Sequence, residues 1–186
     1  MKPNRMRGLL LALVSSLALA LAAPGGAAAQ APESIGTAAE VKALAKSIVR
    51  HRATTWHWQR VMGKPRLPTK HMERKTTDLA HLTAIRDLWK RRAARARARG
   101  QRPPHRAAWL CIKRYEGRWT DPNAPYWGGL QMSMQFQRAF GRYLLRKKGT
   151  ANRWKPAEQM WIAERALRAG LGFHPWPNTA RRCGLL

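Results

Sequence analysis

The sequence predicts a mainly α-helical protein (α+β) with a short extended or hairpin segment, in which a helical N-terminal region precedes a small helical domain. Three observations support this prediction. Apolar residues recur at helical spacing through much of the chain. Gly and Pro separate these periodic stretches, and an extended piece is indicated near Trp127. We divide the 186 residues into three parts, 1–29, 30–100 and 101–186.

Residues 1–29 have the pattern of a secretory signal peptide. Lys2, Arg5 and Arg7 form a basic start, and an apolar stretch follows from Leu9 to Ala23. This stretch is short against the span of about 20 residues that crosses a bilayer, and small residues before Gln30 offer a cleavage site. We therefore expect the remainder to be secreted or cell-wall associated, whether the segment is cleaved or stays as an anchor.

In residues 30–100 two helices are expected. The first carries Val41 and Leu44 at helical spacing, and the second runs from His71 to Arg99. The Gly- and Pro-containing stretch Gly63–Pro68 separates them. The second helix ends in alternating Arg and Ala, which is typical of a solvated basic end. We expect a helical hairpin or a spacer that lies on an anionic surface.

In residues 101–186 we expect a packed core and three helices. Six of the nine Trp, all three Tyr and all three Phe follow Gln101–Pro104. The first helix has Pro104 in its first turn and ends at Gly117, Ser133 caps the second, and the third runs from Pro156 to Gly170. The residues expected to face the core are Ala108, Cys111, Ile112 and Tyr115 in the first helix, Phe136, Phe140, Tyr143 and Leu144 in the second, and Trp161, Ile162 and Ala166 in the third.

The charge and the cysteine content of the sequence limit the kinds of partner, disulfide and metal site that we expect. Lys and Arg number 36 against 9 acids, a formal net charge of +27. Such an excess of positive charge attracts polyanions. A second explanation for the excess is an Arg-rich proteome. In an oxidising compartment Cys111 and Cys183 fit a disulfide, with two free thiols as the alternative. Because neither the cysteines nor the six His show zinc-ligand spacing, we expect no metal and no cofactor.

Glu116 is the candidate catalytic residue. It lies at the C-terminal end of the first helix of the third part, among cations and aromatic rings. A carboxylic acid that still holds its proton is what can protonate a glycosidic oxygen. A single Glu at a helix end is by itself more often structural. The other acids of this part have local explanations, since Glu158 and Glu164 belong to the third helix and Asp121 precedes a proline in a turn.

The motifs around Glu116 follow a recognisable order. An acid followed by Gly and Trp comes first, and a Trp-Pro pair before a final Cys closes the series. In the order of these motifs, residues 105–186 resemble the transglycosylase-like domain of resuscitation-promoting factors, within the lysozyme-like superfamily. The resemblance implies a lysozyme-like fold with a substrate cleft, and cleavage of peptidoglycan between its two amino sugars. The remaining motifs of the series are Tyr126–Gln131, Glu158–Gln159 and Ala163–Arg165.

The resemblance implies roles for particular residues. Glu116 matches the catalytic glutamate, acting as general acid and base, and Gln131 matches a residue of the cleft that contacts substrate. Cys111 and Cys183 match the family disulfide. The aromatic residues that offer flat faces to sugar rings, or else pack in the core, are Trp119, Tyr126 and Trp127.

Asp121 decides between two mechanisms. Hydrolysis by the usual routes needs a second carboxylate facing Glu116, and Asp121 is the nearby candidate. Without it, Glu116 acts first as acid and then as base, which is the lytic transglycosylase outcome. The family places its first cysteine beside the glutamate, whereas Cys111 lies five residues earlier; at about 100° per residue the two offsets point only about 40° apart.

Two other functions remain open on the sequence. One is a non-catalytic cell-wall-binding or signalling protein, and the other is a secreted cationic protein that binds polyanions. Expected partners are peptidoglycan and anionic wall polymers, with a partner wall hydrolase as a further candidate; nucleic acid is not expected. The resemblance does not extend to residues 30–100, so their role is not inferred from it.

Overall fold

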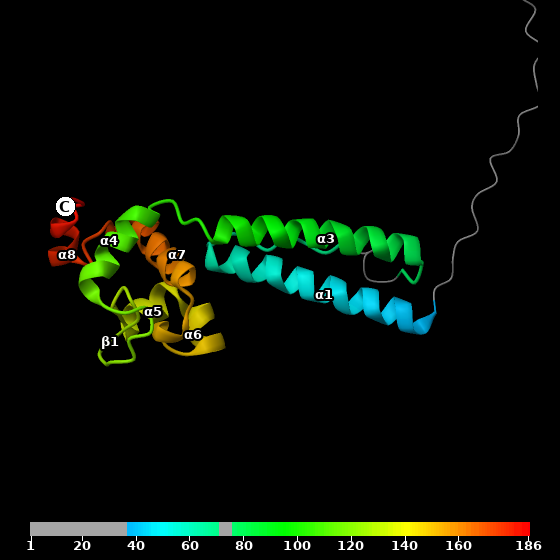
Figure 1. The fold of residues 1–186 in the computed structure, drawn as a ribbon, viewed down its shortest axis with the longest axis horizontal. Coiled ribbons are helices and arrows are strands. Elements are labelled where there is room, and N and C mark those ends of the chain that lie inside the picture. The colour runs from blue at the N-terminus through cyan, green and yellow to red at the C-terminus, as the bar shows by residue number, and fades with distance from the viewer. Residues whose placement is uncertain (1–36, 71–75) are drawn as a thin grey trace, which may run out of the picture. The chain divides into compact units, whose positions relative to one another are not determined.

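The structure, a computed structural model, describes residues 37–70 and 76–186. The expected signal segment, residues 1–29, lies outside this range. The described residues belong to one compact unit, which is mainly helical with a short two-stranded antiparallel sheet (Figure 1). This confirms the mainly α-helical prediction. None of the described helices is long and apolar enough to cross a membrane.

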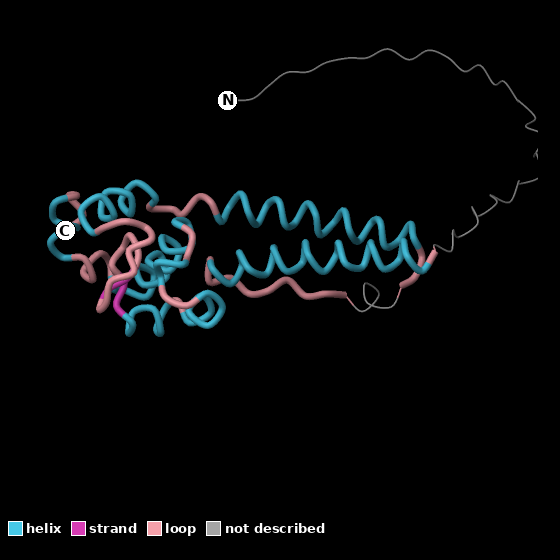
Figure 2. The backbone as a smooth tube through the Cα atoms, turned by 60° about the horizontal axis from the view of Figure 1, so that its bottom comes forward, coloured by secondary structure: helices cyan, strands magenta, loops and turns pink. Residues whose placement is uncertain are grey.

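Helices α1 (Ala38–Val61) and α3 (Leu79–Gly100) lie side by side as a hairpin, which Figures 1 and 2 show from two directions. The second helix begins later than the predicted His71. Residues 71–75 lie outside the described range, but Thr76 and Thr77 are not helical. The helix begins at Leu79 because the Asp78 carboxylate accepts hydrogen bonds from the first backbone N–H groups of the turn.

The hairpin has a small apolar core of its own. Ile48 of α1 packs with Leu82, Ile85 and Trp89 of α3, and each of these side chains is buried. These residues follow the helical periodicity of the sequence. Trp56 packs edge-on against Trp89, with the ring centroids 6.1 Å apart.

Helix α4 (Arg106–Glu116) begins after Pro104 rather than with it in the first turn. The backbone N–H of His105 donates to Glu164 Oε1 at 2.8 Å, which satisfies a donor just before the helix. The helix ends where it was predicted to end, with Gly117 as the residue that follows. Glu116 is therefore the last residue of α4.

The apolar stripe of α4 differs from the predicted one. Tyr115 is 47% exposed, with the guanidinium of Arg182 5.5 Å from its ring centre, so its predicted inward position is wrong. Trp109 and Ile112 are the fully buried residues of the helix. Burial of Trp109 is favourable because its indole N–H donates to Glu164 Oε1 at 2.7 Å.

Strands β1 (Tyr126–Trp127) and β2 (Met132–Ser133) form the short sheet, with Tyr126 opposite Ser133. The connection turns through Gly128, whose φ of +76° favours glycine. A Cβ on Gly128 would also lie 2.5 Å from the side-chain oxygen of Gln159. Both backbone conformation and space therefore require glycine at this turn.

The predicted second helix is two helices, α5 (Met134–Phe140) and α6 (Arg142–Lys148). Ser133 caps the first of them as expected, since its hydroxyl accepts from the Phe136 N–H at 3.2 Å. The interruption falls at Gly141, against which the Trp154 ring packs so closely that a Cβ there would lie 2.5 Å from it. Tertiary packing therefore breaks a stretch that local periodicity predicted to be continuous.

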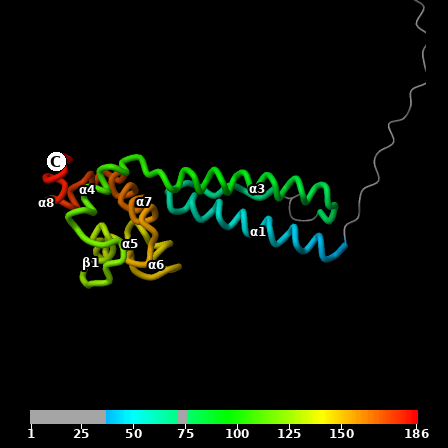
Figure 3. Tube along the Cα trace, in the orientation of Figure 1, coloured from blue at the N-terminus to red at the C-terminus, as the bar shows by residue number. Residues whose placement is uncertain are grey.

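The chain closes with η1 (Ala151–Arg153), α7 (Pro156–Ala166), the π-helical turn η2 (Leu167–Leu171) and α8 (Pro177–Arg182). The third predicted helix therefore leaves α-helical geometry at Ala166, before the expected Gly170. Figure 3 follows the trace from α4 to α8, which lie next to each other although they are far apart in sequence.

The larger core cluster contains residues from both sides of residue 100. Trp58, Val61 and Met62 of the α1 end pack in the same cluster as Trp109 and Trp161. Polar contacts reinforce this packing, because the Trp161 indole donates to the Gly100 carbonyl at 2.7 Å. The end of the hairpin nearest residue 100 therefore belongs to the same core as helices α4 to α8.

Candidate active site

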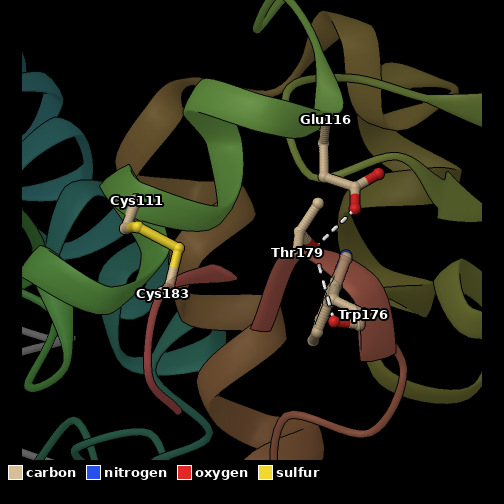
Figure 4. Close-up of a disulfide and its surroundings, with 5 residues drawn as sticks. All are labelled: Cys111, Glu116, Trp176, Thr179 and Cys183. Carbon is tan, nitrogen blue, oxygen red and sulfur yellow. Dashed lines mark hydrogen bonds between the residues drawn. A yellow bond between two sulfur atoms is a disulfide. The ribbon is translucent and has the colours of Figure 1, made fainter. Parts of the chain in front are cut away.

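Glu116 projects from the last turn of α4 towards α8 (Figure 4). The Thr179 hydroxyl donates a hydrogen bond of 2.7 Å to Glu116 Oε1, and its oxygen lies 3.3 Å from the Trp176 carbonyl. Thr179 is buried, whereas Glu116 is half-buried. Within the described residues, Glu116 Oε2 has no hydrogen-bond partner. One oxygen of the carboxylate is therefore held, and the other is left for a proton or a substrate.

A disulfide links Cys111 of α4 to Cys183, the residue that follows α8, with the Cα atoms 6.0 Å apart (Figure 4). The five residues from Cys111 to Glu116 span about 7.5 Å of helix, and the four from Thr179 to Cys183 span about 6 Å. The two helices therefore run antiparallel with matched spacing between their two contacts. The disulfide fixes α8 along α4 so that Thr179 faces Glu116.

Asp121 and Gln131 meet beside the residue that follows Glu116. Gln131 Nε2 donates to Asp121 Oδ2 and to the Gly128 carbonyl, each at 2.9 Å. A Cβ built on Gly117 would lie 3.0 Å from Gln131 Nε2 and 3.3 Å from Asp121 Oδ2. The structure thus places Asp121 and Gln131, which the sequence analysis named, against Gly117, the residue that follows Glu116 in the chain.

The local backbone conformation of Gln131 explains why its side chain points towards Asp121 and Gly128. Its φ is +44°, which is uncommon for a residue other than glycine. The two hydrogen bonds of its side-chain amide compensate for this conformation, and they also tie the β1–β2 turn to the Asp121 loop. A pocket of about 320 Å³ runs along that loop, lined by Arg118, Thr120, Asp121, Pro122 and Asn123.

The three candidate sugar-binding aromatic residues have different environments. Tyr126 is 49% exposed, so its ring is free to stack. Trp119 and Trp127 are half-buried and pack against the larger core cluster. The Lys113 ammonium lies 6.0 Å from the Trp119 ring centre. Tyr126 therefore presents the most accessible ring of the three, while the two tryptophans also have a structural role.

Gln159 is a buried residue to which the sequence analysis gave no role of its own. Its side-chain oxygen accepts from the Gly129 N–H at 2.9 Å, and its amide nitrogen donates to the carbonyls of Trp119 and Ala151 at 2.8 and 2.9 Å. It therefore fixes both the Trp119 loop and the glycine turn. The Glu158–Gln159 motif contained this residue, but only the fold reveals its partners.

Thr179 is the second residue that was missed. It lies in a short helix after Trp176 and Pro177 and carries no sequence signal of a catalytic role. Its contact with Glu116 joins residues 63 positions apart, which no local pattern predicts.

Glu158 at the start of α7 is fully buried but well compensated. Lys148 Nζ lies 2.6 and 2.7 Å from its two oxygens, His57 Nε2 lies 2.8 Å from Oε1, and the Lys155 backbone N–H donates to Oε2 at 2.7 Å. Burial alone raises the pKa of Glu158, but the hydrogen bonds from His57, Lys148 and Lys155 and the charge of Lys148 outweigh it and lower the pKa to about 2. Glu158 is therefore a structural anion.

No group of three or more His, Cys, Asp or Glu side chains within residues 37–70 and 76–186 is arranged to hold a metal ion. Comparison with known proteins gives no further assignment: no protein-family model, curated protein or solved structure matches this chain. A functional proposal therefore depends on the residues of the site and on the motif resemblance.

Proposed function

We propose that this protein is a secreted or cell-wall-associated enzyme that cleaves the glycan strand of peptidoglycan, with Glu116 as its general acid and base. The observation that carries the proposal is the state of the Glu116 carboxylate. It is half-buried at a helix end, held at one oxygen by Thr179 and open at the other. A lysozyme-like arrangement of the domain is part of the same proposal.

In the first step, Glu116 protonates the oxygen of the glycosidic bond. The hydrogen bond from Thr179 occupies Oε1, so Oε2 is the atom that carries the proton. The C–O bond to the leaving sugar breaks as that sugar takes the proton, and positive charge develops at the anomeric carbon of the muramic sugar. Glu116 is left as a carboxylate.

The second step depends on what faces the developing charge. Both oxygens of Asp121 already accept hydrogen bonds, Oδ2 from Gln131 and Oδ1 from the Asn123 backbone N–H at 3.1 Å. These bonds favour Asp121 as a residue that positions the loop rather than as a nucleophile. Glu116 then removes the proton of the muramic sugar's own hydroxyl, whose oxygen bonds to the anomeric carbon and closes an anhydro ring. This is the lytic transglycosylase outcome.

Substrate contacts come from the loop and the short sheet. The Gln131 amide nitrogen is occupied by Asp121 and Gly128, so its side-chain oxygen is the atom available to accept from a sugar hydroxyl. Tyr126 offers an exposed ring face. Trp119 and Trp127 are half-buried, so each contributes only the exposed part of its side chain while it packs on the core.

The decisive experiment is mass spectrometry of the soluble products from purified peptidoglycan. We expect anhydro-muramic products from the wild-type chain and a loss of about 10²- to 10⁴-fold in the rate of release for Glu116→Gln. Asp87→Asn is the matched control, because it removes one carboxylate from the hairpin and should release products at the wild-type rate.

Two results would change this assignment. Products with reducing ends would mean hydrolysis and would return Asp121 to the role of second carboxylate. If the wild-type and Glu116→Gln chains both bind the wall and neither releases product, the protein is a wall-binding module and the enzymatic proposal is wrong.

A further inference from the structure

A second pocket, distinct from the Glu116 site, lies where side chains of α1, α3, α6 and α7 meet. Its volume is about 620 Å³. Helix α1 supplies one wall, the end of α3 a second, and the α6 end together with the α7 start a third. The charged and polar residues that line it are Arg50, Thr54, His57, Arg97, Gln101, Lys147, Lys148, Lys155 and Glu158.

The pocket has a large excess of positive charge. Five Lys and Arg residues line it against a single carboxylate, Glu158. That carboxylate is fully buried and accepts hydrogen bonds from both Lys148 and His57. Lys148 therefore compensates Glu158 within the protein. Four cations of the lining remain without a counter-charge from that carboxylate.

These four cations are Arg50, Arg97, Lys147 and Lys155. Within the described part of the chain, no carboxylate forms a salt bridge with any of them. Lys147 contacts the Tyr143 hydroxyl at 3.4 Å, which supplies no charge. Arg50, Arg97 and Lys155 are exposed. Like charges gathered around one cavity repel each other, and a bound anion would relieve that repulsion.

We propose that this pocket binds an oligophosphate, meaning a ligand with two or more linked phosphate groups. A guanidinium presents paired N–H donors that match the oxygens of a phosphate, and lysine ammonium groups add point charges. One carboxylate would neutralise a single cation of the four, whereas linked phosphates carry several charges within the same space. The Gln101 side chain also lines the pocket and adds neutral hydrogen-bonding capacity.

The site is independent of the glycan-cleavage proposal. Its lining does not include Glu116, Asp121 or Gln131. The test of the pocket measures binding rather than cleavage. A failure of either proposal therefore leaves the other unaffected. The source of the phosphates can be a wall polymer joined by phosphodiesters or a lipid headgroup that carries two or more phosphates, because the pocket recognises the chemistry that they share.

The experiment titrates inorganic tripolyphosphate into the mature full-length chain by calorimetry. We expect saturable binding at one site, with citrate, a tricarboxylate, bound more weakly. The double variant Arg50→Gln/Arg97→Gln should bind tripolyphosphate at least about tenfold more weakly, because it removes two charge-assisted contacts. Neither side chain bonds to Glu158, so the fold should be retained, as circular dichroism and the thermal midpoint can verify.

A matched control separates a built site from diffuse charge. Arg91→Gln/Arg95→Gln removes the same charge from exposed positions of α3 outside the pocket, and it should bind within about twofold of wild type. Equal weakening of both double variants, or the absence of saturable binding, would contradict the proposal. Citrate bound as tightly as tripolyphosphate would also contradict it.

The same two variants identify the source of the phosphates. Each variant is tested for binding to vesicles that contain a lipid with two or more phosphates in its headgroup, and to an isolated phosphodiester wall polymer. Loss of vesicle binding in the Arg50→Gln/Arg97→Gln chain alone identifies the lipid, and loss of polymer binding identifies the polymer. Full binding to both by this variant would overturn the proposal.

Discussion

The two buried glutamates of α7 and the glutamate that ends α4 differ in how completely their oxygens are used. Glu158 accepts from Lys148, His57 and a backbone N–H, and Glu164 accepts from Trp109 and His105. Among the residues that the structure describes, Glu116 accepts from Thr179 alone. The first two are at most 1% exposed, whereas Glu116 is half-buried.

The difference separates two structural carboxylates from the one that we propose to be catalytic. A buried carboxyl group is stable only when its oxygens are hydrogen-bonded, so Glu158 and Glu164 hold elements together and have no capacity to spare. Glu116 is held firmly enough to be oriented, yet one oxygen stays open. The number of partners, rather than position in a helix, therefore distinguishes these three residues.

The largest expected effect on stability comes from Glu164→Ala. This change leaves the buried Trp109 indole and the His105 backbone N–H without their acceptor, so it should cost about 4 kcal/mol of the free energy of unfolding. Urea denaturation measures the loss. Glu116→Ala, tested alongside, should cost less than about 1 kcal/mol. Equal losses for the two variants would erase the distinction between them.

The second prediction concerns acid. The pKa of Glu158 falls from 4.5 to about 2 on folding, so its ionised form stabilises the folded state by roughly 3 kcal/mol. This contribution to the free energy of unfolding is fully present above about pH 4.5. It should be lost as the pH falls towards 2.

This acid dependence can be measured as the unfolding free energy of wild type and Glu158→Gln between pH 5 and pH 2, about the range in which the two ionisation states exchange. The variant should be less stable at pH 5 and should lose less stability across the interval. Parallel pH curves for the two proteins would show that Glu158 is not the group responsible.

The smallest effect sharpens the role of Thr179. Thr179→Val keeps the shape of the side chain but removes the donor to Glu116, so we expect about a tenfold fall in kcat with KM little changed. Thr179→Ser restores the hydroxyl and should recover most of the rate. A Ser variant as slow as the Val variant would mean that packing, and not the hydrogen bond, is what matters.

Local signals in the sequence predicted much of the helical architecture. Periodicity indicated both helices of the hairpin, Gly117 marked the end of α4, and Ser133 marked the start of α5. The errors came where tertiary contacts override local preference. Trp154 packs on Gly141 and divides the predicted second helix into α5 and α6. The Arg182 guanidinium of α8 lies over the ring of Tyr115, which is exposed rather than in the core.

The candidate site was predictable only in part for the same reason. Glu116, Asp121 and Gln131 could be named from motifs because they lie within sixteen positions of each other. Thr179 could not, since it reaches Glu116 across 63 residues. His57 likewise reaches Glu158 across 101 residues, so the cationic pocket between them has no signature in the linear sequence.

The pairing of α4 with α8 also sets an order of events during synthesis. Glu116 is made 63 residues before Thr179, and Cys111 is made 72 residues before Cys183. At about 5 to 20 residues per second, α4 is complete for roughly 3 to 13 seconds before its partner helix exists. The nascent chain thus carries its acidic side chain without the hydroxyl that orients it, and the site is assembled only when α8 has been made.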